Sequence, residues 1–458
     1  MSEKSANLLR KPQIVPGKKD NPFERFGLSQ NPFPNKPSLV VGSDNPPYLA
    51  ELRAKEEREF ENWLIPHPDR SKPRLITFLM DYATRRGRGI GKTAFLNHQC
   101  KRIMRDLGSS LTNDTYVLFA TYILPLPGGK CRKFWQFSQL IAEAITEQDM
   151  VAMAMWRLRA FSGLIPAEIL EQVGDNLEET IGNDVWLRRH DVDVDFKLVD
   201  TLKDSLEQAG IRAEVAEILS RYGHDSSTWR RNFLAHQTDF RWRQIGNQLV
   251  FDDLVRLFVL AGFSKGLLLI DEVEKIVPYQ NISERRAFVE SLRYFFIDGP
   301  CENTRRDFYS LFLTIHPYLQ ELLAPHWEAA GLDRFAALSR EFAQEYTVYF
   351  GPLNQELAEP LVKTYLDAYR IDNDQKGPLW PLDKAAVEEA LFRTGGVPGK
   401  MLTLLYQIME RAIKEKWNAI GAEQIRQVIQ VNPPEEPGGD EFDSTALPSS
   451  IPDLKKEG

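Results

Sequence analysis

The 458-residue chain carries 57 Lys and Arg against 65 Asp and Glu, a formal net charge of −8 at pH 7, and 43% of its residues are hydrophobic. This composition predicts a globular protein of about two to three domains, and the acidic balance excludes a protein that coats nucleic acid over its whole surface, although a local basic face stays open. The cysteines are scattered and odd in number, which argues against a disulfide framework or a zinc site and indicates a reducing compartment: Cys100, Cys131 and Cys301.

The N-terminal residues lack the apolar core of a signal peptide. Ser264 and Lys265 interrupt the longest apolar run, so no stretch reaches the roughly 18 apolar residues of a membrane span. We therefore expect a cytoplasmic protein without a membrane span. Residues 1–22 are polar and 23–72 are rich in proline with one short helix near 48–63, so 1–72 is predicted to be a lead-in segment.

The first motif is the run Gly-Arg-Gly-Ile-Gly-Lys-Thr at 87–93, directly behind an apolar run at 75–80. A strand that breaks into a glycine-rich turn and reopens as a helix, here near 92–107, forms a cradle for phosphate. Lys92 can reach the outer phosphates, and the Thr93 hydroxyl can hold Mg²⁺. The candidate nucleotide-binding residues are Gly87, Gly89, Ile90, Gly91, Lys92, Thr93 and Ala94. The usual pattern has a glycine where this chain has Arg86.

After the loop, strands and helices alternate, interrupted by a long helical stretch. The pattern predicts further strands at 116–123, 266–270, 309–315 and 346–350, with helices at 133–146, 251–262 and 283–297. The segment near 147–247 reads as successive amphipathic helices, and 353–430 is predicted to be all helical. The tail after residue 432 is rich in Pro, Gly and acidic residues and is predicted to be disordered.

This alternation predicts an α/β fold with a mostly parallel sheet flanked by helices on both faces, as in P-loop NTPases. The expected domains are the lead-in at 1–72, a nucleotide-binding domain at 73–350 with a helical insertion at about 147–247, a helical lid at 351–431, and the tail at 432–458. Ligands of such sheets bind at the carboxyl ends of the strands, where the phosphate loop lies.

The second motif is the apolar strand at 266–270, which ends in Asp271 and Glu272. An aspartate at this edge can bind Mg²⁺ through water, and the following glutamate can orient or deprotonate an attacking water. The alternative is a strand capped by solvated acids. A phosphate loop followed by an Asp-Glu strand end is far more specific than either motif alone, and it predicts binding of ATP with Mg²⁺.

Several separated stretches resemble one family. They are Phe-Gly-Leu-Ser-Gln-Asn-Pro-Phe at 26–33, Ile-His-Pro-Tyr-Leu at 315–319, Ser-Arg-Glu-Phe at 339–342, Gly-Pro-Leu at 351–353 and Thr-Gly-Gly-Val-Pro at 394–398. In order and spacing they resemble the AAA+ ATPases of the ExeA, TnsC and MuB type, which act in secretion and transposition. The resemblance covers roughly residues 23–430 without the insertion.

The resemblance implies further roles for four residues. His316 falls at the polar sensor position, although a histidine at a strand end is more often structural. Arg340 falls where the family has an arginine that reaches a neighbouring subunit's nucleotide, with Arg334 the next choice, although an arginine on an amphipathic helix is more often a surface residue. The family's lid arginine is replaced by Gly399, and Lys400 follows as a shorter donor toward the nucleotide.

The insertion carries an aromatic series at helical spacing with arginines beside it: Trp229, Phe233, His236 and Phe240, with Arg230, Arg231, Arg241 and Arg243. Such a series is more typical of a core face with a solvated margin. The alternative is a surface that binds the backbone of DNA or RNA. Acids at Asp191, Asp193 and Asp195 show that the insertion as a whole is not basic, so partner-protein binding is equally open.

These observations together predict an ATP-binding, slowly hydrolysing switch. Its catalytic residues are expected to be Glu272 and Lys92, with His316 and Arg340 from the family comparison. Its nucleotide state would control a homo-oligomer, as a ring or filament, and the binding of DNA or of a partner protein such as a transposase, a nuclease or an assembly component. A protein-remodelling or secretion-assembly ATPase and a nucleotide-locked signalling module with little turnover remain as alternatives.

Overall fold

The structure is a computed structural model. It describes residues 21–35, 48–64, 75–81, 89–109, 117–173, 177–222, 226–239, 246–298, 307–339 and 343–431. The described chain forms two compact units: the first holds the described parts of 1–38, 45–49 and 353–458, and the second those of 50–352. Within the described ranges, no helix is long and apolar enough to cross a membrane.

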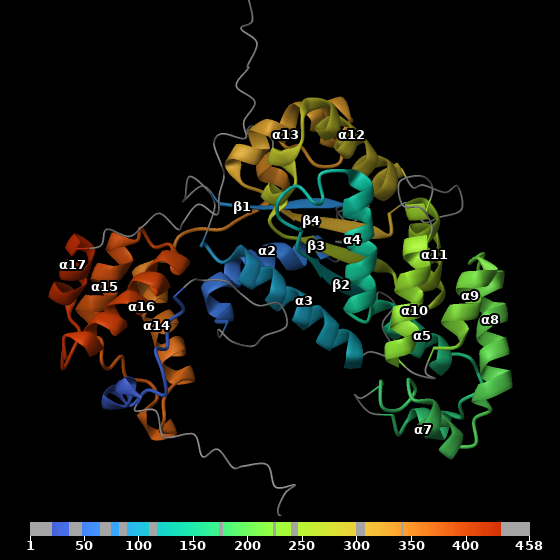
Figure 1. Ribbon diagram of the computed structural model, residues 1–458, viewed down its shortest axis with the longest axis horizontal. Coiled ribbons are helices and arrows are strands. Elements are labelled where there is room, and N and C mark those ends of the chain that lie inside the picture. The colour runs from blue at the N-terminus through green and yellow to red at the C-terminus, as the bar shows by residue number, and fades with distance from the viewer. Residues whose placement is uncertain are drawn as a thin grey trace, which may run out of the picture. The chain divides into compact units, whose positions relative to one another are not determined.

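The second unit is built on a five-stranded sheet in the order β2-β3-β4-β1-β5. Figure 1 labels β1 to β4 of this sheet. Its strands are β1 (Ile76–Met80), β2 (Leu118–Ile123), β3 (Lys265–Ile270), β4 (Tyr309–Thr314) and β5 (Thr347–Tyr349). All neighbouring strands are parallel. Every residue of β1, β3 and β4 is buried, because helices cover both faces of the sheet.

Alternate strand residues face two halves of the core. Phe78 points to the half formed with α4 (Phe134–Glu147), α11 (Gly246–Leu260), α12 (Ile282–Arg293) and α13 (Pro317–Ala329). Leu79 points to the half formed with α2 (Ala54–Leu64) and α3 (Lys92–Ser109), where the Phe60 ring lies 5.5 Å from that of Phe95. The predicted α/β fold, with a parallel sheet between two layers of helices, is confirmed.

The segment between β2 and β3 is helical beyond α4, as the sequence predicts. Its helices are α5 (Met150–Ala160), α6 (Ala167–Leu170), α7 (Asp184–Arg189), α8 (Val199–Gln208), α9 (Ala213–Ser220) and α10 (Ser226–Asp239). A buried ion pair joins α5 to α7, with Arg159 Nη1 2.9 Å from Asp184 Oδ1.

The aromatic series of the insertion forms part of its core. The Trp229 ring stacks on Phe233 at 5.4 Å and meets Tyr222 edge to face at 4.8 Å. Both Trp229 and Phe233 are buried, so the core interpretation is confirmed for these two residues. Arg230 pairs with Asp149. The side chain of His236 is outside the described set, as are Phe240, Arg241 and Arg243.

The described residues of the first unit form four longer helices: α14 (Gln355–Ala368), α15 (Lys384–Arg393), α16 (Pro398–Lys414) and α17 (Ala422–Val431). The N-terminal turn Pro22–Phe26 and the residues after it pack on these helices, since Leu28 pairs with Arg370 and Phe33 stacks on Tyr365 at 6.2 Å. The segment 1–72, predicted to be a single lead-in, is therefore divided between the two units, because residues 50–64 belong to the unit that contains the sheet. The predicted tail at 432–458 lies outside the described residues.

Candidate nucleotide site at the carboxyl edge of the sheet

The described part of the phosphate loop has the backbone that such a cradle needs. Gly89 and Gly91 have φ of +83° and +102°, the left-handed region that favours glycine. The Phe95 amide donates to the Gly91 carbonyl at 3.0 Å, so the helical hydrogen bonding of α3 begins directly behind the loop. The N-terminal end of a helix carries a partial positive charge, which suits an anion. Gly87 and Arg86 lie outside the described residues.

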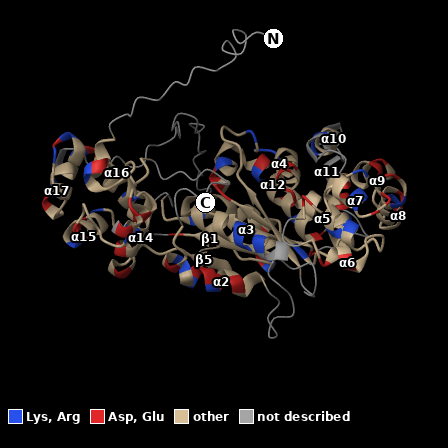
Figure 2. Ribbon diagram, turned by 90° about the horizontal axis from the view of Figure 1, so that it is seen from below, with Lys and Arg blue, Asp and Glu red and all other residues tan. Residues whose placement is uncertain are grey.

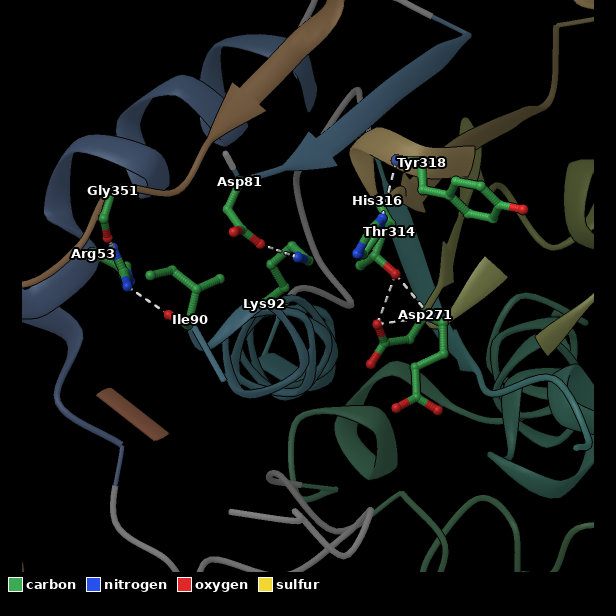
Figure 3. Close-up of polar contacts among 10 residues, drawn as sticks. Arg53, Asp81, Ile90, Lys92, Asp271, Thr314, His316, Tyr318 and Gly351 are labelled. Atoms are coloured by element: carbon green, nitrogen blue, oxygen red, sulfur yellow. Dashed lines mark hydrogen bonds and ion pairs between the residues drawn. The ribbon is translucent and has the colours of Figure 1, made fainter. Parts of the chain in front are cut away.

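Lys92, the lysine of the loop, is engaged by an acid that the sequence analysis did not single out. Its Nζ lies 2.5 Å from Oδ2 of Asp81, the first residue after β1, and both side chains are buried (Figure 3). Water cannot screen a pair this deeply buried, so the attraction is strong. A phosphate group that binds Lys92 must therefore compete with a carboxylate already in place.

Asp271 is held by three donors at the end of β3. Its Oδ1 accepts hydrogen bonds from the Thr314 hydroxyl at 2.8 Å and from the Glu272 amide at 2.9 Å. Its Oδ2 accepts one from the Tyr122 hydroxyl at 2.8 Å. The carboxylate is buried and its orientation is fixed, as expected of a group that must present oxygens to a metal or its water.

Glu272 has an unusual backbone conformation. Its φ is +45°, in the left-handed region that non-glycine residues rarely adopt, and its amide also donates to Thr314 Oγ1 at 2.7 Å. Such strain tends to gather at functional sites. The half-buried Glu272 carboxylate forms an ion pair with Lys275, three residues later in the chain.

One hydrogen-bond network links the acidic strand end to the phosphate-loop helix. Asn97 on α3 donates to the Thr93 carbonyl at 3.1 Å and also bonds to Tyr122. Burial and the neighbouring Asp271 carboxylate both raise the pKa of Tyr122, so its hydroxyl stays protonated and remains a donor. The first turn of α3 and the end of β3 are therefore fixed relative to each other.

Glu274 is a further acid of this site that the sequence analysis did not assign. Burial raises its pKa to about 7, and the charge on Asp271 contributes in the same direction while Lys92 opposes it. Its position two residues beyond Glu272 was a signal available in the sequence.

The other predicted site residues differ in how the structure places them. The Nδ1 atom of His316 accepts a hydrogen bond from the Tyr318 amide at 3.0 Å, so His316 caps α13. Thr314, two residues earlier, bonds directly to Asp271 and was missed. Arg334 is exposed and Arg340 lies outside the described residues. Lys400 lies on α16 in the first unit, and its contact with a nucleotide stays a prediction.

The residues present fit a magnesium nucleotide. Among the described residues, no cluster of three or more His, Cys, Asp or Glu is placed to hold a metal on its own. Mg²⁺ is commonly held by one or two protein oxygens together with water and substrate phosphates. Asp271 and the Thr93 hydroxyl are the protein oxygens predicted for this role, and the loop glycines and Lys92 have the chemistry to receive phosphate.

The fold and the site together define the class. A parallel sheet with the phosphate loop after β1 and an Asp-Glu pair after β3, with β4 between them, is the arrangement of a P-loop NTPase. No protein-family model matches the sequence, and no curated protein matches it. Among solved structures the chain is similar to the Aeropyrum pernix ORC2 protein in its ADPNP–ADP complexes, with a TM-score of 0.48 and 11% identity over 89% of this chain and 74% of that chain.

Proposed function

We propose that the protein is an AAA+ ATPase that binds MgATP, hydrolyses it slowly and uses its nucleotide state as a switch. One observation carries the proposal: the phosphate loop at the start of α3 and the Asp271–Glu272 pair meet at the carboxyl edge of one parallel sheet, joined by the network through Tyr122. This arrangement supports a single site in which the residues proposed to bind phosphate and metal act together.

Each residue has a distinct part in the proposed reaction. Lys92 exchanges Asp81 for the outer phosphates of the nucleotide. The Thr93 hydroxyl would hold Mg²⁺ directly and Asp271 would hold it through water. When bound, Mg²⁺ would supply neutralisation of the charge on the phosphate oxygens. Glu272 turns from Lys275 to orient and deprotonate the attacking water.

The remaining parts of the switch follow the family resemblance. His316 would sense the outer phosphate, Arg340 would reach the nucleotide of a neighbouring subunit, and Lys400 would contribute from the lid. Closure around MgATP would then set the assembly of a ring or filament. Binding of DNA or of a partner protein would follow the assembly state, as in transposition or mobile-element defence.

A nucleotide-locked module with little turnover is the second candidate. Each of the two residues proposed for turnover already forms an ion pair with another side chain. Lys92 pairs with Asp81, and Glu272 pairs with Lys275. Breaking the Glu272–Lys275 pair adds to the barrier for hydrolysis, which favours a long-lived ATP-bound state, whereas the Lys92–Asp81 pair opposes nucleotide binding.

Glu272→Gln tests the proposed reaction. The amide cannot take a proton from water, so hydrolysis should fall at least about 100-fold while the affinity for MgATP stays within about threefold. Phosphate release and equilibrium binding of a fluorescent ATP analogue would be measured on the same preparation, with Glu290→Gln on the exposed face of α12 as the control. Unchanged hydrolysis in Glu272→Gln would remove this residue from its role, and binding without measurable hydrolysis in the unaltered protein would favour the locked module.

A further inference from the structure

A buried arginine connects the phosphate loop to the end of β5. Arg53 lies in the turn Ala50–Arg53 that precedes α2, and it is 5% exposed. Its Nη2 donates to the Ile90 carbonyl at 2.5 Å and its Nη1 donates to the Gly351 carbonyl at 2.9 Å (Figure 3). One side chain thus bonds two segments far apart in sequence, and neither bond belongs to the sheet or to a helix.

The bond to Ile90 has a consequence for the cradle. In a trans peptide the carbonyl oxygen and the following N–H point in opposite directions. Because Arg53 holds the Ile90 oxygen on its own side, the Gly91 N–H is directed away from Arg53. Gly91 has φ of +102°, and a Cβ added there would lie 4.0 Å from Arg53 Nε. Arg53 therefore sets the orientation of one amide in the loop that is proposed to receive phosphate.

The surroundings of Arg53 fit a fixed connector. Glu56 accepts from Nη1 at 2.9 Å and neutralises the charge, which makes burial of the guanidinium tolerable. The guanidinium carbon also lies 5.4 Å from the centre of the Phe350 ring, where the arginine can stack. An arginine donates in several directions from one rigid plane, whereas a lysine ammonium cannot span both carbonyls.

Gly351 lies where the chain leaves the sheet. It follows β5 by two residues and precedes Leu353, where the chain enters the first unit. We propose that Arg53 is a positioning residue that holds the phosphate loop ready for the nucleotide and transmits its occupancy to the segment leaving β5. This inference rests on the proposed function, because it names how the same ATP site communicates with the rest of the chain.

Two variants of Arg53 and one control test the inference. Arg53→Met removes both bonds. Arg53→Lys keeps the charge beside Glu56, and so preserves the fold if the methionine variant does not. Arg58→Met removes an exposed arginine from α2 of the same segment and is the matched control.

The measurements are the affinity for mant-ATP with Mg²⁺ and amide hydrogen exchange at saturating nucleotide. Loss of a charge-assisted hydrogen bond predicts affinity about tenfold weaker or more in Arg53→Met. In the unaltered protein, nucleotide should slow exchange both at 89–95 and in a peptide spanning 347–357. In both Arg53 variants, saturating nucleotide should protect 89–95 but leave 347–357 unchanged, which a general loss of stability would not produce.

The outcomes separate the two proposals. Absence of mant-ATP binding by the unaltered protein would contradict the proposed function and this inference with it. Binding by the unaltered protein, together with normal affinity and normal protection of 347–357 in Arg53→Lys, would overturn the role of Arg53 alone. Arg58→Met should match the unaltered protein in every measurement.

Discussion

At the scale of single residues, the pair between Lys92 and Asp81 bears most directly on the proposed binding of phosphate by the loop. The two groups lie 2.5 Å apart and are shielded from water. The lysine is therefore held ready in position, but its charge is already neutralised. A nucleotide gains the full attraction of Lys92 only by replacing the carboxylate or by sharing the ammonium with it.

Asp81→Asn should strengthen binding of ATP by about tenfold, because the neutral amide keeps a hydrogen-bond acceptor but no longer competes as a charge. Titration with mant-ATP at fixed Mg²⁺ measures this affinity. Asp333→Asn, which makes the same change at an exposed residue, is the control. Weaker binding in Asp81→Asn would show instead that Asp81 orients Lys92 and does not compete for it.

At the scale of elements, the ends of β2, β3 and β4 build the acidic half of the site together. Tyr122 on β2 and Thr314 on β4 both donate to Asp271 at the end of β3, which lies between them in the sheet. Three strands must therefore keep their register for one carboxylate to keep its orientation. This half of the site depends on the sheet more than on any loop.

Tyr122→Phe should lower the rate of hydrolysis about tenfold with little change in the affinity for ATP, because Asp271 loses the donor that fixes its Oδ2 while the phosphate loop is untouched. Steady-state kinetics would separate the turnover number from KM. Tyr309→Phe on β4 is the matched control, since its hydroxyl is buried without a hydrogen-bond partner in the described structure. Equal kinetics in the two variants would contradict a role for Tyr122.

The elements themselves could be predicted from the sequence, because local patterns determine them. Apolar runs marked the strands, and the glycine-rich turn before Lys92 marked the start of α3. The contacts of Arg53 could not be predicted, since Gly351 is 298 residues away and the pairing depends on the completed sheet. Asp81, Tyr122 and Thr314 could not be assigned for the same reason, because only the folded sheet brings Asp81 beside Lys92 and Tyr122 and Thr314 beside Asp271.

At the scale of the whole molecule, the N-terminal region contributes to both units. Residues 21–35 pack in the unit that contains α14 to α17, while 50–64 pack against α3 and the sheet. Lys and Arg are interspersed with Asp and Glu on the described helices of both units, as Figure 2 shows. The chain therefore crosses between the two units at residues 49–50 and again at 352–353, directly after Gly351.

The central claim is that the loop at 89–93 binds a nucleotide, and equilibrium binding of MgATP to the unaltered chain and to Lys92→Ala tests it most directly. Lys101→Ala, which alters an exposed lysine on the same helix, serves as the control. We expect one nucleotide per chain for the unaltered protein and for Lys101→Ala. We expect affinity at least about 100-fold weaker for Lys92→Ala, because Lys92 is the loop lysine proposed to reach the outer phosphates. No binding by the unaltered chain, or equal affinity in Lys92→Ala, would contradict the account.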